Sequence, residues 1–261
     1  IVDRIYIARI PDVGTTALGA VGLCFPIITI ILAFSNLFGS GGAPLFSIER
    51  GRKDTKESSM IMNTSFFLIC VCALLLMAVG MIFAKPILLL FGSSENGLIY
   101  AYPYLMIYLL GTFPSMVSTG MNPFINAQGY ATTGMFSVAI GAIANLILDP
   151  VFIFGLGQGA AGAAMATVIG NVIADVYYIY VMSKKAKRLS VSLKEIKIPG
   201  TMIRDILVIG IPASITNLMQ SIMIMITNHY LIAYGTDKVA AMGIALKANM
   251  ISAFILVGFA F

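Results

Sequence analysis

The sequence predicts an all-α, polytopic bundle of membrane-spanning helices, and its composition, its uncharged stretches and its loop charges are the observations that predict it. Of the 261 residues, 59% are hydrophobic and 10% are charged, with a mean hydropathy of +0.96. In a soluble domain about a quarter of the residues are charged, because its surface faces water. The composition therefore excludes a water-soluble globular protein, a disordered chain and a disulfide-stapled domain.

Five stretches of the chain contain no Asp, Glu, Lys or Arg. They are 13–48, 58–84, 96–148, 150–174 and 206–236. A hydrocarbon core of about 30 Å requires about 20 helical residues. Each stretch is therefore long enough for one span, and 96–148 is long enough for two. Helices are expected because backbone hydrogen bonds must be satisfied inside lipid.

Charged and turn-forming residues bound each expected element. We predict a first helix that ends near Ile10, followed by spans over 17–47, 58–84, 98–121, 135–154, 160–182, 206–232 and 239–261. The connections are Arg9–Thr16, Glu49–Glu57, Lys85–Gly97, Asn122–Gly134, Gly155–Gly159, Ser183–Asp205 and Ala233–Lys238. Glycine and charged residues in these connections end apolar helices. The chain begins at Ile1 and stops inside an apolar run, so we expect a piece of a longer protein.

Lysine and arginine are concentrated on one side of the predicted topology. Eleven lie in two loops on that side: Arg50, Arg52, Lys53, Lys56, Lys184, Lys185, Lys187, Arg188, Lys194, Lys197 and Arg204. Four lie on the other: Arg4, Arg9, Lys85 and Lys238. The positive-inside rule places 49–57 and 183–205 in the cytoplasm. The net charge of +5 thus indicates topology rather than a nucleic-acid partner.

Tyrosines are expected to form the interfacial belt, because the sequence has no tryptophan. Two groups lie near predicted helix ends: Tyr100, Tyr102, Tyr104 and Tyr108, and then Tyr177, Tyr178 and Tyr180. We interpret them as interfacial anchors in preference to a substrate cage.

Asp149 is an ionisable residue within a predicted span, and such residues mark an ion or substrate path by default. Asn145 precedes it by four residues and shares its helix face. Pro150 has no N–H, so the carbonyl of Leu146 loses its helical partner. Carboxylate, amide and carbonyl oxygens suit a small cation or a proton. The alternative is a structural aspartate satisfied by neighbouring helices.

The Gly155–Gly159 turn makes the spans on either side an antiparallel hairpin. Residues equidistant from its centre lie at similar depth, which pairs Asp149 with Thr167 and Asn145 with Asn171. Asp3, about ten residues before the centre of the first turn, is expected at comparable depth on the same outer side. Its alternative is an interfacial residue paired with Arg4 or Arg9.

Further polar residues within the spans are candidates for lining a cavity: Asn171, Asp175, Asn217, Gln220, Asn228 and Lys247. Lys247 would face a cavity or extend toward the interface. We favour a hydrogen-bonded interfacial role over a proton relay for His229.

A weak internal repeat suggests two related lobes. Asp3–Arg9 aligns with Asn228–Tyr234, and Ala20–Gly22 aligns with Ala241–Gly243 at a similar offset. Internal repeats are typical of secondary transporters.

The chain resembles the multidrug and toxic compound extrusion (MATE) family of secondary exporters along nearly its whole length. Five stretches carry the resemblance: Val2-Asp3, Ala127-Gln-Gly129, Asn145-Leu-Ile-Leu-Asp-Pro150 with Phe152-Ile-Phe154, Gly162-Ala-Ala-Met-Ala-Thr167, and Ile209-Gly-Ile-Pro212. The resemblance implies two six-helix lobes in the full protein. Here these would be an N-terminal lobe over 1–182, a cytoplasmic loop over 183–205, and the start of a C-terminal lobe over 206–261.

The resemblance also implies a cation site, whose members correspond to Asp3, Asn145, Asp149 and Thr167. Na⁺ is a possible occupant. Two positions depart from the family pattern. Gln220 stands where some members carry a glutamate, which puts an acidic site in the second lobe in doubt. Asn126 stands where an arginine is common.

The function expected from these observations is export of drug-like, often cationic compounds, coupled to Na⁺ or H⁺. A flippase of the same fold superfamily for lipid-linked or polysaccharide precursors is the alternative. It would be expected to show more cationic residues in its cavity than Lys247 alone. A membrane-embedded enzyme would need a Ser/Lys, paired Asp or His/Glu constellation, and the sequence shows none. We expect no cofactor beyond the coupling ion, no nucleic-acid partner, and a monomer surrounded by lipid in a bacterial cytoplasmic membrane.

Overall fold

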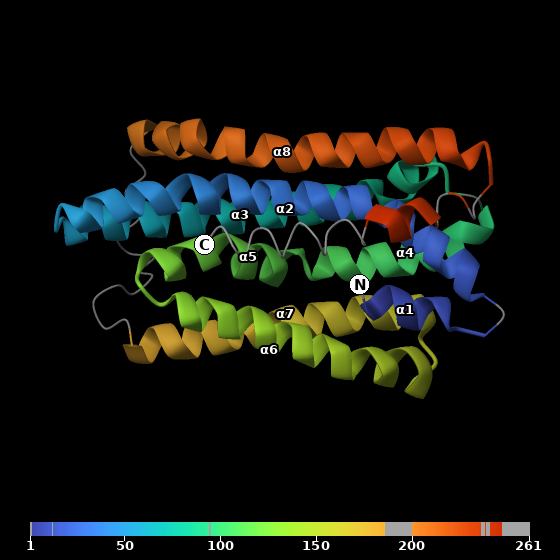
Figure 1. Cartoon of the computed structure of the whole chain (residues 1–261). Helices are drawn as coiled ribbons and strands as arrows, with labels where there is room; N and C mark the ends of the chain where they lie inside the picture. The colour runs from blue at the N-terminus through green and yellow to red at the C-terminus, as the bar shows by residue number, and fades with distance from the viewer. Residues whose placement is uncertain are drawn as a thin grey trace.

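The described part of the chain is helical throughout (Figure 1). The computed structural model describes residues 2–11, 13–93, 95–185, 200–235, 238 and 241–246. Its elements are α1 (Val2–Ala8), α2 (Gly14–Gly51), α3 (Thr55–Leu90), α4 (Glu95–Leu110), α5 (Thr112–Ala127), α6 (Ala131–Pro150), the π-helical turn η1 (Val151–Gly155), α7 (Gly159–Lys185) and α8 (Gly200–Ile232). Five described helical stretches are long and apolar enough to cross a membrane: α2, α3, α6 with η1, α7 and α8.

The helices pack in layers, with α2 near the centre (Figure 1). α8 lies along one side of α2, and α3 and α5 pack against its other faces. The α6–α7 pair lies on the opposite side of α4 and α5 from α8. The short α1 contacts α2, α6 and α7. The prediction of an all-α polytopic bundle is therefore confirmed.

The span predicted over 98–121 differs from the structure, because α4 and α5 are two consecutive helices separated at Gly111. Pro114 cannot donate a hydrogen bond to the carbonyl of Leu110, which weakens the helix at this point. A Cβ at Gly111 would collide with the side chain of Val168 on α7. The break therefore lies at a close contact with α7. Of the span predicted over 239–261, residues 241–246 are helical and 247–261 lie outside the described residues.

Three glycines of α2 allow three neighbouring helices to approach its backbone. A Cβ at Gly39 would collide with the backbone of Gly120 on α5, and a Cβ at Gly41 would collide with the backbone of Ile206 and Gly210 on α8. Gly42 faces Ser65 of α3 and Phe124 of α5. Small residues favour such contacts in lipid, because close backbone packing replaces a hydrophobic driving force.

The α6–α7 hairpin has nearly the predicted register. A Cβ at Gly170 would lie 3.4 Å from Cβ of Asn145, so Asn145 is level with the residue next to Asn171. After Pro150, η1 widens the helix, and the Leu156 amide donates to the Val151 carbonyl at 2.9 Å. Gly162 packs against the backbone of Phe152 in this turn. π-helical turns often occur beside functional sites.

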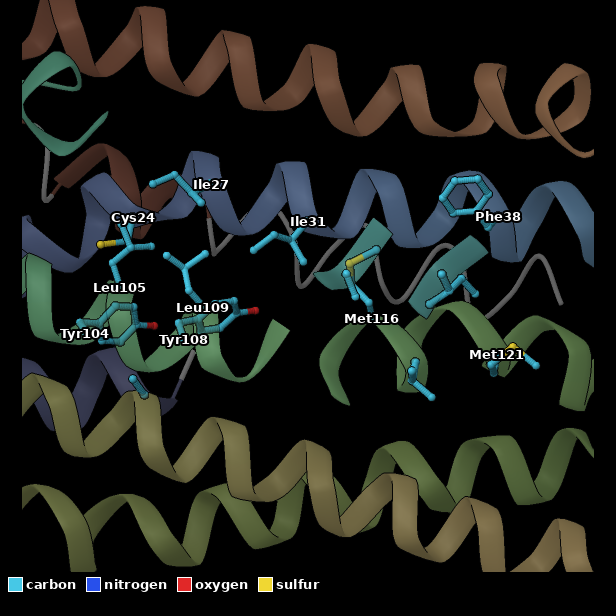
Figure 2. Packing of buried hydrophobic residues seen from close by; sticks show 14 of the residues in the cluster. Cys24, Ile27, Ile31, Phe38, Tyr104, Leu105, Tyr108, Leu109, Met116 and Met121 are labelled. Atoms are coloured by element: carbon cyan, nitrogen blue, oxygen red, sulfur yellow. The ribbon is translucent and has the colours of Figure 1, made fainter. Parts of the chain in front are cut away.

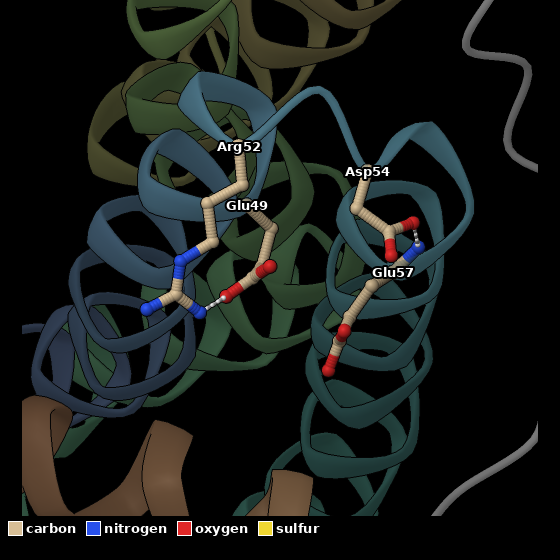
Figure 3. Close-up of polar contacts among 4 residues, drawn as sticks. All are labelled: Glu49, Arg52, Asp54 and Glu57. Carbon is tan, nitrogen blue, oxygen red and sulfur yellow. Dashed lines mark hydrogen bonds and ion pairs between the residues drawn. The ribbon is translucent and has the colours of Figure 1, made fainter.

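Polar contacts hold the connection between α2 and α3 (Figure 3). The Asp54 side chain caps α3 by accepting hydrogen bonds from the amides of Lys56 and Glu57 at 3.1 and 2.9 Å. Arg52 pairs with Glu49 at 2.7 Å. These contacts lie in the basic loop that the charge distribution assigns to the cytoplasm.

Buried side chains from α2, α4 and α5 form the core shown in Figure 2. Tyr104 and Tyr108 point into this core, stacked with ring centroids 6.4 Å apart, and are only 6% and 8% exposed. Their interpretation as interfacial anchors is therefore wrong, as it is for the buried Tyr178. Tyr102 and Tyr180 are 39% and 54% exposed, as interfacial anchors would be.

Candidate cation site

Three helices bring Asp3, Asn145, Asp149 and Thr167 into one cluster, which we call the outer site. Asp3 lies on α1, Asn145 and Asp149 lie on α6, and Thr167 lies on α7. The Asn145 amide nitrogen is 3.4 Å from Asp149 Oδ1 and 3.2 Å from Thr167 Oγ1. Thr167 Oγ1 is 3.3 Å from Asp3 Oδ2 and 3.0 Å from the Ala163 carbonyl. The outer site therefore joins residues that are up to 164 positions apart in the sequence.

The Asn145 amide lies between the two carboxyl groups and cannot donate to both. One end of the amide is 3.4 Å from Asp149 Oδ1, and the other is 3.0 Å from Asp3 Oδ1. In either orientation the amide oxygen therefore faces a carboxyl oxygen. Two acceptor oxygens 3.0 to 3.4 Å apart repel each other, and a proton or a cation between them removes this repulsion. The geometry of the outer site is therefore suited to a positively charged occupant.

Asp149 is the most deeply buried member of the outer site, with 0% of its surface exposed. Its Oδ2 accepts no hydrogen bond from the residues that the structure describes. An unpaired carboxylate in such surroundings is costly unless a proton or a cation neutralises it. The oxygen ligands of the four residues suit Na⁺ as well as a proton. Within the described part of the chain, no group of three or more His, Cys, Asp or Glu residues could hold a metal ion.

None of the other described residues predicted to line a cavity hydrogen-bonds a member of the outer site. Asn171 and Asp175 follow Thr167 on the same face of α7, toward its C-terminal end. Asn217, Gln220 and Asn228 lie on α8, which packs mainly along α2. Asn228 is buried, whereas Gln220 and the neighbouring His229 are exposed. Lys247 lies outside the described residues.

Two core tyrosines near the outer site were missed as functional candidates. Tyr104 and Tyr108 lie close enough to Asp3 to interact with its charge. Their spacing of four residues places both hydroxyl groups on one face of α4. This periodicity was the available signal. Arg4, beside Asp3, has its guanidinium 5.3 Å from the ring centroid of Phe25.

Thr167→Val is expected to weaken cation coupling without unfolding the protein. Valine keeps the shape of threonine but removes the hydroxyl between Asn145 and Asp3, a loss of about 1 kcal/mol, or about fivefold in affinity. The measurement is the Na⁺ or H⁺ concentration that half-saturates drug efflux by the full-length protein. Thr29→Val is the matched control, because its hydroxyl also bonds a carbonyl four residues earlier, at 2.9 Å, but in α2. An equal effect of both substitutions would contradict the assignment of Thr167.

The chain matches one family profile and several curated proteins that share a name. The sequence profile of the MatE family matches residues 1–151. The multidrug export protein MepA of Staphylococcus haemolyticus is 31% identical over 241 residues, which cover 92% of this chain and 53% of that protein. MepA of Staphylococcus aureus is 27% identical over the same length. The chain thus spans about half the length of the curated relatives it matches.

Solved structures agree with this result. One described as the inward-facing conformation of a multidrug resistance MATE family transporter of the MOP superfamily superposes with a TM-score of 0.89 at 25% identity. The superposition covers 96% of this chain and 57% of that one. The apolar helices and the bacterial relatives identify the chain as a multi-pass protein of a bacterial cell membrane.

Proposed function

Because the chain belongs to the MatE family, whose members are transporters rather than enzymes, we propose that the protein exports drug-like, often cationic compounds in exchange for Na⁺ or H⁺. The names of its relatives support the export of drugs. The outer site supports the coupling to a cation, because it gathers two carboxyl groups and leaves a buried oxygen of Asp149 without a partner.

Neutralisation of the two carboxyl groups links cation binding to the arrangement of the helices. When the outer site is unoccupied and both carboxyl groups are ionised, two negative charges repel each other in a region of low dielectric constant. Binding of Na⁺ or of a proton removes this repulsion and draws α1 toward α6 and α7. The cation therefore stabilises one arrangement of the helices relative to another. The size of this stabilisation is set by how much more tightly the cation binds the first arrangement than the second. A substrate that prefers the other arrangement is released as the cation binds.

The protein is organised as two lobes joined by a loop. Residues 1–182 form the N-terminal lobe that holds the outer site, 183–205 link the lobes in the cytoplasm, and 206–261 begin the C-terminal lobe. The protein works as a monomer surrounded by lipid, which meets its exposed apolar side chains on α3, α6 and α7. The coupling ion is the only additional component that the outer site requires.

Efflux from vesicles under imposed gradients tests this function. Full-length protein is reconstituted with a fluorescent cationic dye, and a Na⁺ gradient or a pH gradient is applied separately. Dye movement driven by one of the two gradients, and absent without a gradient, is the expected result. Movement of a lipid-linked precursor instead of the dye would support the flippase alternative. No response to either gradient would overturn cation coupling.

A further inference from the structure

A second buried carboxyl group lies on α7, toward the cytoplasmic end from the outer site. Asp175 follows Thr167 by eight residues, which is about 12 Å along a helix. Asp175 is 8% exposed, and its Oδ1 accepts no hydrogen bond within the described part of the chain. A buried carboxylate must be neutralised by a proton or paired with a cation. Asp175 therefore requires a positively charged partner of its own.

The groups around Asp175 are hydroxyls. Ser118 of α5 lies close enough to the Asp175 carboxyl group for the two side chains to interact. Tyr178, one turn later on α7, lies close enough to interact with its charge. Tyr178 is also 8% exposed, and its hydroxyl has no hydrogen-bond partner among the described residues. Asp175 thus lies in a buried pocket of oxygen atoms that can donate or accept a proton.

No ion pair joins Asp175 to a basic residue within the described part of the chain. α5 and α6 as far as Leu148 lie within the uncharged stretch 96–148. The charged residues on the helices packed against α7 are Asp3, Arg4, Glu49, Arg50, Glu95 and Asp149. None of these pairs with Asp175 among the described ion pairs. With one carboxyl group and two hydroxyls, the pocket is better suited to a proton than to a metal cation, which would need more ligands.

Two facing polar stripes connect this pocket to the outer site. The stripe on α7 consists of Thr167, Asn171, Asp175 and Tyr178, and the stripe on α4 and α5 consists of Tyr104, Tyr108, Ser115 and Ser118. The first set has the spacing of one face of α7, as do Tyr104 and Tyr108 on α4 and Ser115 and Ser118 on α5. Tyr108 lies close enough to Ser115, and Ser118 close enough to Asp175, for their side chains to interact.

The two stripes run in parallel, in a constant register. Gly111 packs against Val168, and Ser118 contacts Asp175, so the offset between the two helices is the same at both points. At the outer end, Tyr104 and Tyr108 interact with the charge of Asp3. The stripes therefore form a polar seam from Asp3 to Asp175 along α4, α5 and α7.

We propose that Asp175 is a proton-binding site, formed with Ser118 and Tyr178, that passes the coupling proton between the outer site and the cytoplasm. A proton that leaves the outer site along the seam forms an O–H bond with a carboxylate oxygen of Asp175. It then leaves to cytoplasmic water and regenerates the carboxylate. This proposal rests on the proposed function, because it requires an outer site that exchanges protons.

Infrared spectroscopy of the full-length protein tests the binding site without transport. In wild-type protein, the carbonyl absorption of protonated carboxyl groups should contain a pH-dependent component that Asp175→Asn removes. Tyr178→Phe should shift the frequency of this component, because it changes the hydrogen bonding of the pocket. Asp205→Asn, which changes an exposed carboxyl group of α8, is the control. Spectra unchanged by Asp175→Asn, or a component that does not respond to pH, would overturn the proposal.

Efflux driven by a pH gradient tests the role in transport. Asp175→Asn should slow efflux about 100-fold, the low end of what a positioned proton-transfer group contributes, and Asp175→Glu should restore most of the rate. If Asp149→Asn stops efflux while Asp175→Asn keeps the wild-type rate and spectrum, the site at Asp175 is wrong and the proposed function stands. If Asp149→Asn retains full efflux, the proposed function fails as well.

Discussion

Asp149→Asn is expected to reduce cation-driven drug efflux by the full-length protein to the background of vesicles without protein. The substitution keeps the size of the side chain and removes the negative charge that holds the cation. Asp149 is fully buried, and one of its oxygen atoms lacks a partner among the described residues, so the substitution leaves Asp3 as the one carboxyl group of the outer site. The measurement is dye efflux under the effective gradient, normalised to the amount of protein in the membrane.

Two comparisons keep this result interpretable. Asp205→Asn removes an exposed carboxyl group in the N-terminal part of α8 and should transport at the wild-type rate. Membrane expression and thermal unfolding of Asp149→Asn should match those of the wild type or exceed them, because the substitution relieves repulsion between Asp149 and Asp3. Normal efflux by Asp149→Asn would exclude the outer site as the coupling site.

Gly41→Leu is expected to have the largest effect on stability. A side chain at this position meets the backbone of Ile206 and Gly210, which cannot move aside as a flexible side chain can. We expect a loss of about 3 kcal/mol, the upper end of the usual cost of overpacking. The loss would appear as a lower thermal unfolding midpoint and poor recovery of monodisperse protein. Transport should fall with it, because α2 and α8 belong to the two proposed lobes.

Gly51→Leu is the matched control for this substitution. Gly51 ends the same helix, and a Cβ there meets nothing within 4 Å. Leucine is also a better helix former than glycine, so the free energy of unfolding of the Gly51→Leu variant should be unchanged or slightly higher. Equal unfolding midpoints for Gly41→Leu and Gly51→Leu would show that close packing of α2 on α8 does not stabilise the fold.

Much of the fold could be predicted from charge alone. The uncharged stretches locate the spans because an unpaired charge is costly in lipid, whereas the orientation indicated by the 11 basic residues of two loops stays a prediction. The Gly155–Gly159 turn fixes the depth of residues on both of its sides, and so groups Asp149 with Thr167. The approach of Gly170 to Asn145 lies within one residue of that register.

Tertiary packing decided the features that the sequence left open. The break at Gly111 depends on the contact with Val168, which is 57 residues away in the chain. Tyr104 and Tyr108 were assigned to the interface because tyrosine often lies there, but their helical spacing agrees with the buried face that they occupy. The contact of Ser118 with Asp175 depends on how α5 packs on α7, which single-sequence periodicity does not specify.

Cation uptake by the purified full-length protein tests the outer site most directly. Uptake of Na⁺ and of protons is measured for the wild type, for Asp205→Asn and for the double variant Asp3→Asn/Asp149→Asn. The double variant is expected to lose one bound cation of the coupling kind, while Asp205→Asn retains it. Undiminished uptake of both Na⁺ and protons by the double variant would contradict a cation site at Asp3 and Asp149.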